Sequence, residues 1–578
     1  MLNEKQRYRA IATVAAIAFL AKLALALNTY GTNDVYTYER FGLWSRYFGA
    51  ELYKIAPDLN HPPSMLHLLR LLIGVGEWTH LGFAFCIRFP GIVADAGTVW
   101  LICRILGPRI GERSVFWAVL LIAASPTNIL VSGFHGNTDP VMIFFVLLMV
   151  WLVGYRDRAA AGGVAFGIAF CIKIAPVVLM PVLFFALKGV RRKAAFFAAA
   201  GALVLVAWAP YLYQEPVAVF HQVFGYKSSY GLWGVSWLLR GLANAWPASQ
   251  GINSAFSKVG SPLVMAGIVL LSIRMSFLKK SLYAQAGMVF LFFFTATSGF
   301  AVQYMVWLVP WLAELGVFPV ACFVLTGSVF LLVVYNYWNL GMPWYMAIAY
   351  PWSSHQYFQV WCWASVILLA IAAWCRMRYD EELDYGWIGR ISPVLRASVA
   401  AVVAVGVLFY PAVIHMRRDA FGVAPAYGQD VVLYTQADEL HNMSMELARR
   451  GRTKEASEVD DQVRRLTDHA EVIYDSLVRE QPSRATLRTP EDYVDASLQD
   501  YNTAAYPQCV YDATESLKGR PGMPAALNNI TLCQAEMGNW DAAIVAAREG
   551  VRVEPESAEA RQNLDYVLAG KNGTQLEH

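Results

Sequence analysis

Apolar runs of 18 or more residues recur along the chain from residue 10 to residue 414. An α-helix needs about 20 apolar residues to cross the hydrocarbon core of a bilayer, so each long run predicts a transmembrane helix. Charged residues make up only 15% of the chain, compared with about 25% in soluble domains. The first run is too long for a signal peptide and lacks a small-residue cleavage site. The sequence therefore predicts an all-α, polytopic membrane protein.

The net charge of +3 hides an uneven distribution of charged residues. Residues 415–578 hold 17 Lys and Arg against 27 Asp and Glu, whereas residues 1–414 hold 29 against 16. The basic excess of the membrane part lies in short loops, and such loops face the cytoplasm. The net charge thus gives no reason to expect a nucleic-acid partner. With the basic clusters inside, we expect about thirteen transmembrane helices and place the residues after 414 on the outer face.

The predicted spans cover residues 10–27, 88–107, 114–132, 140–154, 194–212, 260–276, 282–297, 303–315, 318–337, 358–375 and 394–414, together with a pair of short helices within 159–190. This pair is predicted to meet at "CIKIAP", which leaves Lys173 at the tip of a hairpin, where a lone charge is costly. Residues 35–82 are too polar to span. Two amphipathic helices are expected there, over 35–48 and 62–75, in the outer interface.

The sequence after residue 414 becomes polar and reads as helical. Residues 506–529 align with residues 540–563 at a shift of 34, which is the period of tetratricopeptide repeats. Such repeats stack helix pairs and usually bind a partner, although they also serve as packing or dimer surfaces. The predicted domains are the membrane domain 1–414, a helical linker 415–495, a soluble repeat domain 496–572, and a tail 573–578 whose final "LEH" resembles an expression-tag remnant.

Cys509 and Cys533 lie on helices of this region that are expected to be neighbours. A disulfide between them would suit an oxidising compartment. Cys509, however, aligns with Ala543, a small packing position, which favours a free buried thiol.

Polar residues collect on the predicted outer face, although a solvated loop would also be polar. They are Asp34, Glu39, Arg40, His61, Arg88, His135, Asn137, Asp139, Lys227, Gln303 and Tyr304, with Lys173 reaching them from the hairpin.

Five segments of the membrane part resemble the GT-C glycosyltransferases, integral membrane enzymes that take a sugar from a polyprenyl phosphate. "DLNHPPSMLHLLRLL" and "IRFPGIVADAGTVWLICRIL" resemble the first loop and second span of that superfamily. "ASPTNILVSGFHGNTDP", "IKIAPVVLMPVL" and "GFAVQYMVWLVP" resemble the branch of mannosyltransferases that use polyprenyl-phosphate-mannose. The resemblance extends over about residues 10–375 and implies a GT-C-like fold with an acid after the first transmembrane helix, the position of Asp34. Relatives often carry two acids there, whereas this chain has Asn33 before Asp34.

Glycosyl transfer from a phosphate donor needs an activated acceptor hydroxyl. A carboxylate can accept the hydroxyl proton, so Asp34 is the candidate catalytic base. The alternative is that Asp34 only caps the first amphipathic helix, because Asp is a favoured cap residue.

The departing phosphate gains negative charge, so cations must stabilise it. Lys173 is one candidate, and the alternative is a Lys that snorkels or pairs with a structural acid. Arg88 matches an Arg of the superfamily and is the second candidate, against a role as an interfacial anchor.

The remaining candidates would contact the donor sugar or the acceptor. His135, Asn137 and Asp139 come from "FHGNTDP", where the alternative is a helix cap followed by Pro140 in the first turn. His61, Gln303 and Tyr304 complete the set, whereas Glu39 and Arg40 are expected to form an ordinary interfacial pair.

The resemblance implies an inverting, metal-independent enzyme, so no metal or other cofactor is expected. The predicted function is transfer of a hexose, mannose first, from a polyprenyl-phosphate donor to a glycan, glycolipid or protein acceptor at the outer face of a bacterial inner membrane, in the cell envelope. A transporter or flippase for a lipid-linked sugar is the main alternative, and it predicts internal repeat symmetry and charges deep in several spans. A non-catalytic membrane-anchored scaffold is the third reading, and it would need neither Asp34 nor Lys173.

Overall fold

The computed structural model describes residues 3–226, 228–338, 346–347, 357–379, 418–479, 489–502 and 505–571. The chain divides into two compact units, Met1–Ala470 and Glu471–His578. Within the described residues, helices form nearly all the regular structure, and the two short strands β1 (Gly31–Thr32) and β2 (Met346–Ala347) pair in parallel.

Seven helical segments of the first unit are long and apolar enough to cross a membrane. They are α1 (Glu4–Asn28), α5 (Phe83–Ile105), the segment Arg113–His135, α11 (Val190–Gln214), the segment Pro247–Ser276, α16 (Val317–Trp338) and α17 (Tyr357–Tyr379). Shorter apolar helices accompany them: α8 (Asp139–Tyr155), α9 (Ala159–Ile172), Ala175–Ala186 and α15 (Leu282–Ala296). The prediction of an all-α polytopic membrane protein is confirmed. The expected span 394–414 and Lys227 lie outside the described residues.

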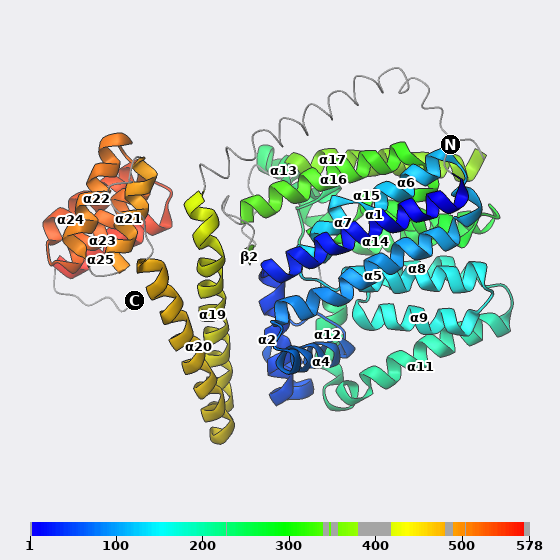
Figure 1. Cartoon of the computed structure of the whole chain (residues 1–578), viewed down its shortest axis with the longest axis horizontal. Helices are drawn as coiled ribbons and strands as arrows, with labels where there is room; N and C mark the ends of the chain where they lie inside the picture. Colours follow the sequence, from blue (N-terminus) through cyan, green and yellow to red (C-terminus); the bar gives the residue numbers. More distant parts are fainter. Residues whose placement is uncertain are drawn as a thin grey trace, which may run out of the picture. The chain divides into compact units, whose positions relative to one another are not determined.

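The first unit is a bundle in which α1 runs from the N-terminus at one end to α2 (Asn33–Phe48) at the other (Figure 1). The two helices expected within 35–82 are present as α2 and α4 (Pro63–Thr79), joined through η1 (Gly49–Glu51) and α3 (Leu52–Ile55). The remaining elements of this unit are η2 (Gly107–Arg109), α12 (Pro216–Gly225), α13 (Gly234–Ala245) and η5 (Pro247–Ser249), which leads into α14 (Gln250–Ser276).

The segment Arg113–His135 is a broken helix. α6 (Arg113–Ala123) ends before Ser125, and Pro126 begins the short helix α7 (Pro126–Leu130). Proline lacks an N–H donor and cannot continue the hydrogen-bond ladder of the preceding helix. A π-helix, η3 (Val131–His135), then ends at Gly136, whose φ of 88° is in the region that favours glycine.

The hairpin expected at "CIKIAP" is present: α9 ends at Ile172, with Lys173 as its C-cap, and η4 (Ala175–Leu179) leads into α10 (Met180–Ala186). The span expected over 303–315 is not an α-helix. Two 3₁₀ helices replace it, η6 (Val302–Trp307) and η7 (Val309–Leu315). Their side chains are buried in the protein almost throughout, so the apolar composition reflects the core and not contact with lipid.

A buried ion pair inside the bundle was not predicted, because each of its two residues lies within a long apolar run of the sequence. Lys22 of α1 pairs with Asp95 of α5, and their side chains are 6% and 2% exposed. The Asn128 amide of α7 donates to the other Asp95 oxygen at 2.8 Å. Charges inside a membrane domain are costly unless paired, so this trio holds three helices in register.

α19 (Arg418–Arg449) and the start of α20 (Thr453–Arg479) also belong to the first unit, and α19 contacts α2. The Gln436 amide donates to the Glu39 carboxylate at 2.5 Å. Arg40 pairs with Glu439 at 3.1 Å and also with Asp58. The expectation that Glu39 and Arg40 pair with each other is therefore wrong, because each faces a different partner.

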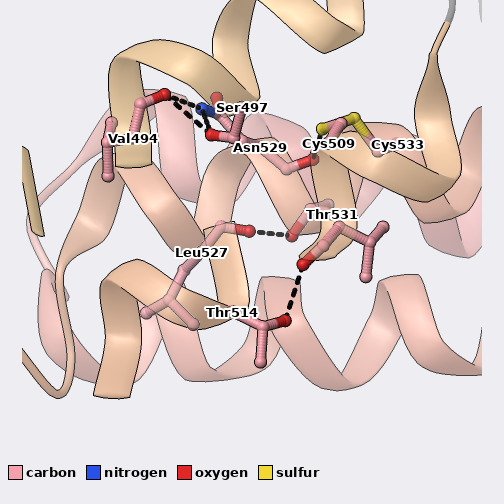
Figure 2. Close-up of a disulfide and its surroundings, with 9 residues drawn as sticks. Val494, Ser497, Cys509, Thr514, Leu527, Asn529, Thr531 and Cys533 are labelled. Carbon is pink, nitrogen blue, oxygen red and sulfur yellow. Dashed lines mark hydrogen bonds between the residues drawn. A yellow bond between two sulfur atoms is a disulfide. The ribbon is translucent and has the colours of Figure 1, made fainter. Parts of the chain in front are cut away.

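The second unit contains α21 (Pro490–Asn502), α22 (Tyr506–Gly519), α23 (Pro524–Glu536), α24 (Trp540–Val553) and α25 (Ala558–Lys571). α22 and α24 begin 34 residues apart, as do α23 and α25. Cys509 and Cys533 form a disulfide between α22 and α23, so the preference for a free thiol is wrong (Figure 2). Nearby, the Asn529 amide donates to Ser497 at 2.7 Å and ties α23 to α21.

Candidate active site

The helix that follows α1 carries Asp34 in its first turn. Its N-cap is Thr32, whose hydroxyl accepts from the Asp34 backbone N–H at 3.4 Å. The capping role considered for Asp34 is thus filled by Thr32. The Asp34 side chain is 30% exposed and faces a cavity.

This cavity has a volume of about 490 Å³. Its wall combines one carboxylate, one ammonium and an amide from the predicted set: Asp34, Lys173 and Asn137. His61, Gln303 and Tyr304 also line it, so six of the nine predicted site residues reach one space. His135 and Asp139 lie behind the wall, 3% and 0% exposed.

Asp34 is held by two donors, one from the last residue of η3 and one from the loop that leads to α8. The Asn137 amide donates to Asp34 Oδ2 at 2.7 Å, and His135 Nε2 lies 3.2 Å from the same oxygen. An ionised carboxylate only accepts, so this contact needs the proton on Nε2. The other ring nitrogen, Nδ1, lies 2.9 Å from the Tyr335 hydroxyl oxygen.

The segment that carries His135 is locked against the start of α2. The Thr32 hydroxyl donates to the His135 carbonyl oxygen at 2.8 Å. Gly31 has φ of 107°, and a Cβ there would lie 2.6 Å from the Phe134 carbonyl oxygen. A side chain at Gly136 would likewise collide with Val35. Glycine at both positions lets the two backbones approach closely enough for the imidazole to reach Asp34.

Lys173 is the C-cap of α9, and its side chain reaches the start of α8. Its ammonium donates to Asp139 Oδ2 at 2.5 Å and to Asn137 Oδ1 at 3.3 Å. The other Asp139 oxygen accepts from the Trp307 indole at 2.6 Å. The ammonium also lies 5.4 Å from the centre of the Tyr304 ring, a cation–π distance. Asn137 therefore bridges the two charged groups, donating to Asp34 and accepting from Lys173.

The electrostatic surroundings keep Asp34 ionised. Burial by itself raises the pKa of Asp34, but the hydrogen bond and charge of His135 oppose it. With the help of Asn137 and Lys173, these contacts lower the pKa from 3.8 to about 2. Burial and the charge of Lys173 lower the pKa of His61 to about 3, so this imidazole is neutral at physiological pH.

Arg88 does not line the cavity. Its side chain is 1% exposed, and its guanidinium donates to backbone carbonyls of Ala84, Ala26, Thr29 and Gly133. These bonds join α5, the end of α1 and η3. Arg88 therefore lies outside the cavity, contrary to its prediction as a phosphate-binding residue. Its hydrogen bonds instead tie together the segments that lead to Asp34 and His135.

Several residues of the site were not predicted. Trp307 and Tyr335 come from segments 168 and 200 residues away from the side chains they contact, and nothing local in the sequence marks them. A second group, the serine wall, comprises Ser228, Ser257, Ser261 and Ser298 on the cavity lining. The hydroxyl oxygens of Ser261 and Ser298 lie 2.9 Å apart, and the Ser228 hydroxyl oxygen lies 2.6 Å from that of Tyr304. In the described residues, no group of three or more His, Cys, Asp or Glu side chains could hold a metal ion.

Residues 60–213 match the family of dolichyl-phosphate-mannose-protein mannosyltransferases. The matched region includes His135, Asn137, Asp139 and Lys173 and stops well before Gln303. It supports the resemblance to the GT-C superfamily. Comparison with curated proteins gives no match.

Proposed function

We propose that this chain is an inverting glycosyltransferase that moves a hexose, mannose first, from a polyprenyl-phosphate donor to an acceptor hydroxyl. One observation carries the proposal: Asp34 and Lys173 face the same cavity and are bridged by Asn137. A base for the acceptor and a cation for the leaving phosphate are therefore held at a fixed separation. The family match over residues 60–213, to enzymes described as dolichyl-phosphate-mannose-protein mannosyltransferases, points to the same reaction class.

In this mechanism, Asp34 accepts the proton of the acceptor hydroxyl as the oxygen attacks the anomeric carbon. A new C–O bond forms on one face of the sugar while the bond to the phosphate oxygen breaks on the other. The lowered pKa of Asp34, about 2, ensures that the carboxylate is ionised before the acceptor arrives. His135 and Asn137 fix its orientation, which removes the entropy cost of positioning the base.

Lys173 stabilises the phosphate as its charge grows. An ammonium has three N–H donors, and among the described residues Asn137 and Asp139 accept two of them. The third can be donated to a phosphate oxygen. A reading in which Lys173 only neutralises Asp139 is less favoured, because its side chain, 13% exposed, reaches the cavity wall whereas Asp139 is fully buried.

The rest of the cavity suits a sugar. His61 stays neutral and lies against the Tyr38 ring, with centroids 5.0 Å apart. Gln303, Tyr304 and the serine wall offer the amide and hydroxyl groups that recognise sugar hydroxyls. We assign these residues to binding of the donor sugar or the acceptor, which is a glycan, a glycolipid or a protein.

The second unit fits a location outside the cytoplasm. Disulfides persist in oxidising compartments, and Cys509–Cys533 is such a bond. We place this unit, and the transfer reaction, on the outer face of a bacterial inner membrane. The repeated 34-residue spacing of its helix pairs suits tetratricopeptide repeats. Their stacked helices would hold a protein partner or acceptor.

The test uses purified full-length protein in lipid, with radiolabelled polyprenyl-phosphate-mannose and a membrane-lipid extract. Asp34→Asn should lower the transfer rate about a thousandfold, because it removes a general base, while donor binding is retained. The matched control is Asp58→Asn, which neutralises another carboxylate on the cavity lining and should keep the rate within a few-fold. An equal loss of transfer rate in both variants would show that Asp34 has no special role as the base. If the wild-type protein bound no prenyl-linked sugar, the glycosyltransferase proposal would be wrong and a membrane-anchored scaffold would be the better interpretation.

A further inference from the structure

An open hollow of about 460 Å³ lies where α9 and α11 begin, two helices that pack side by side (Figure 1). Arg158, Arg191 and Arg192 line it, and alanines of both helices complete the lining. The C-cap of α9 is Lys173, and a helix of 14 residues extends for about 21 Å. The hollow is therefore at the other end of α9 from the active-site cavity, and a ligand there would be separate from the donor of the proposed reaction.

The two loops that meet at this hollow are strongly basic. Residues 156–158 and 188–193 hold six Lys and Arg and one acid, Asp157, so their net charge is +5. Asp157 pairs with Arg192. Arg158 and Arg191 are exposed, and neither forms an ion pair with a residue that the structure describes. Two guanidinium groups thus face the hollow without a carboxylate, and their mutual repulsion would fall if an anion lay between them.

The starts of the two helices add to this positive charge. The N-cap residues are Arg158 and Gly189, neither of which makes a side-chain capping hydrogen bond, and neither first turn contains an acid. The first backbone N–H groups of a helix have no acceptor within it, and they form the positive end of its dipole. The alanines of the lining have short side chains, so a ligand held by the arginines could approach these N–H groups.

Exposed apolar side chains border the basic loops. Val190, directly before Arg191, is 83% exposed, and Phe184 is 49% exposed. The ammonium of Lys193 lies 3.8 Å from the centre of the Phe184 ring, so this ring is close to the basic cluster. A ligand with acyl chains beside its phosphate would bury such apolar surface, which is favourable. Inorganic phosphate could use only the charged part, so the surroundings favour a phospholipid.

We propose that this hollow binds the head group of an anionic phospholipid at the membrane face opposite the active site. The planar guanidinium groups of Arg158 and Arg191 match phosphate oxygens in pairs. Arg192, oriented by Asp157, adds a third positive charge. Basic pockets between membrane helices are suited to anionic head groups, and the basic loops are expected on the cytoplasmic side. The proposal does not depend on the reaction proposed above.

The experiment measures binding to full-length protein in phosphatidylcholine nanodiscs. Phosphatidylglycerol is titrated into the discs in one arm and inorganic phosphate is added in the other, with the midpoint of thermal unfolding and native mass spectrometry as readouts. We expect saturable stabilisation by phosphatidylglycerol and about one retained lipid. An equal response to inorganic phosphate, with no further gain from the lipid, would overturn the assignment to a phospholipid. Stabilisation that never saturates would show general attraction of charge and would also overturn it.

Matched variants separate the hollow from the other basic residues of the bundle. Arg158→Gln combined with Arg191→Gln should weaken binding at least about tenfold, which corresponds to about 1.4 kcal/mol. The control, Arg104→Gln combined with Arg274→Gln, removes two exposed arginines that lie outside the hollow and should change binding less than about twofold. Equal effects of the two pairs, or no effect of either, would contradict the proposal.

A substitution in the first turn of α9 tests the site without weakening the helix. Ala161 is exposed and lines the hollow. Ala161→Glu places a carboxylate there, which suits the start of a helix but repels a phosphate, so folding without the anionic lipid should be unimpaired. Binding of phosphatidylglycerol should fall at least about tenfold, whereas Ala161→Gln, of similar size and no charge, should keep it within a few-fold. Equal binding by Ala161→Glu and the wild type would rule out a head group in this hollow.

Discussion

At the scale of single residues, Asn137 links the two charges that the proposed reaction needs. Its amide donates to Asp34 at 2.7 Å, while its oxygen accepts from Lys173 at 3.3 Å. The motif "FHGNTDP" and the lone Lys173 could be singled out from sequence because polar groups are costly in a membrane domain. The orienting role of Tyr335 could not, because that contact depends on a segment 200 residues away.

The pH dependence of transfer follows from two lowered pKa values. Asp34, with pKa of about 2, is ionised and His61, with pKa of about 3, is neutral at every pH well above those values. Because both pKa values are lowered, each group would change its protonation only as the pH falls toward 3 or below. We expect kcat/KM to show no acidic limb from either group between about pH 5 and pH 8. A limb near pH 6 that disappears in His61→Asn would contradict this assignment.

The buried pair Lys173–Asp139 predicts non-additive effects on stability. Lys173→Met leaves the Asp139 carboxylate buried without its cation, and Asp139→Asn leaves the ammonium without its anion. Each single change should lower the free energy of unfolding by about 3 kcal/mol. The double variant should lose clearly less than the sum, as measured by thermal unfolding in lipid. Additive losses would show that the interaction between the two side chains contributes little to the stability.

At the scale of whole elements, hydropathy predicted the long helices well, because lipid imposes a minimum length on each span. It failed over residues 303–315, where an apolar composition reflects burial inside the protein and the chain forms 3₁₀ helices. The hydropathy pattern also gave no sign of Lys22 and Asp95, because one charge in a long apolar run hardly changes the mean hydropathy of that run. Their pairing across α1 and α5 is visible only in three dimensions.

The contact between α19 and α2 should depend on pH through Glu39. Burial raises the pKa of Glu39 from 4.5 to about 7, against hydrogen bonds from Gln436 and Tyr30. The folded state therefore binds more protons than the unfolded state between these pH values, and the stability of the contact falls as the pH rises through that window. Hydrogen exchange of α19 should thus be faster at about pH 8 than at about pH 6, after correction for intrinsic rates.

Two variants check this prediction. Glu39→Gln keeps the shape of the side chain without the titration, so the pH dependence of exchange in α19 should disappear. Glu439→Gln removes the neighbouring ion pair with Arg40 and should leave that dependence in place. A dependence that persists in Glu39→Gln would assign the effect to another group.

At the scale of the whole molecule, the sequence predicts a membrane part followed by a helical repeat region, but it does not predict the covalent link in the second unit. The alignment of Cys509 with Ala543 favours a packing role only if the two repeats are equivalent at that position. The structure joins Cys509 to Cys533 across α22 and α23, so the first helix pair carries a link that the second lacks. A repeat pattern predicts shared positions and cannot show where one copy departs from the others.

The disulfide should stabilise the second unit. It closes a loop with a sequence separation of 24, which corresponds to about 3 kcal/mol of unfolded-state entropy. Cys509→Ser combined with Cys533→Ser should speed hydrogen exchange in α22 and α23 of the full chain, whereas Cys322→Ser, at a free thiol, should leave it unchanged. Thiol labelling after denaturation without reductant should miss both Cys509 and Cys533. Labelling of either one would contradict the bond.

The close approach of the chain at Gly31 and Gly136 has a consequence for redesign. These contacts lock the backbone on the Asp34 side of the cavity, and any side chain larger than hydrogen would push the two segments apart. The serine wall, with Ser257 and Ser261 on α14, is not subject to this constraint. A library that varies only the serine wall would therefore sample new acceptor shapes while the proton-accepting oxygen stays where it is, so retargeting the protein and preserving its chemistry become separable tasks.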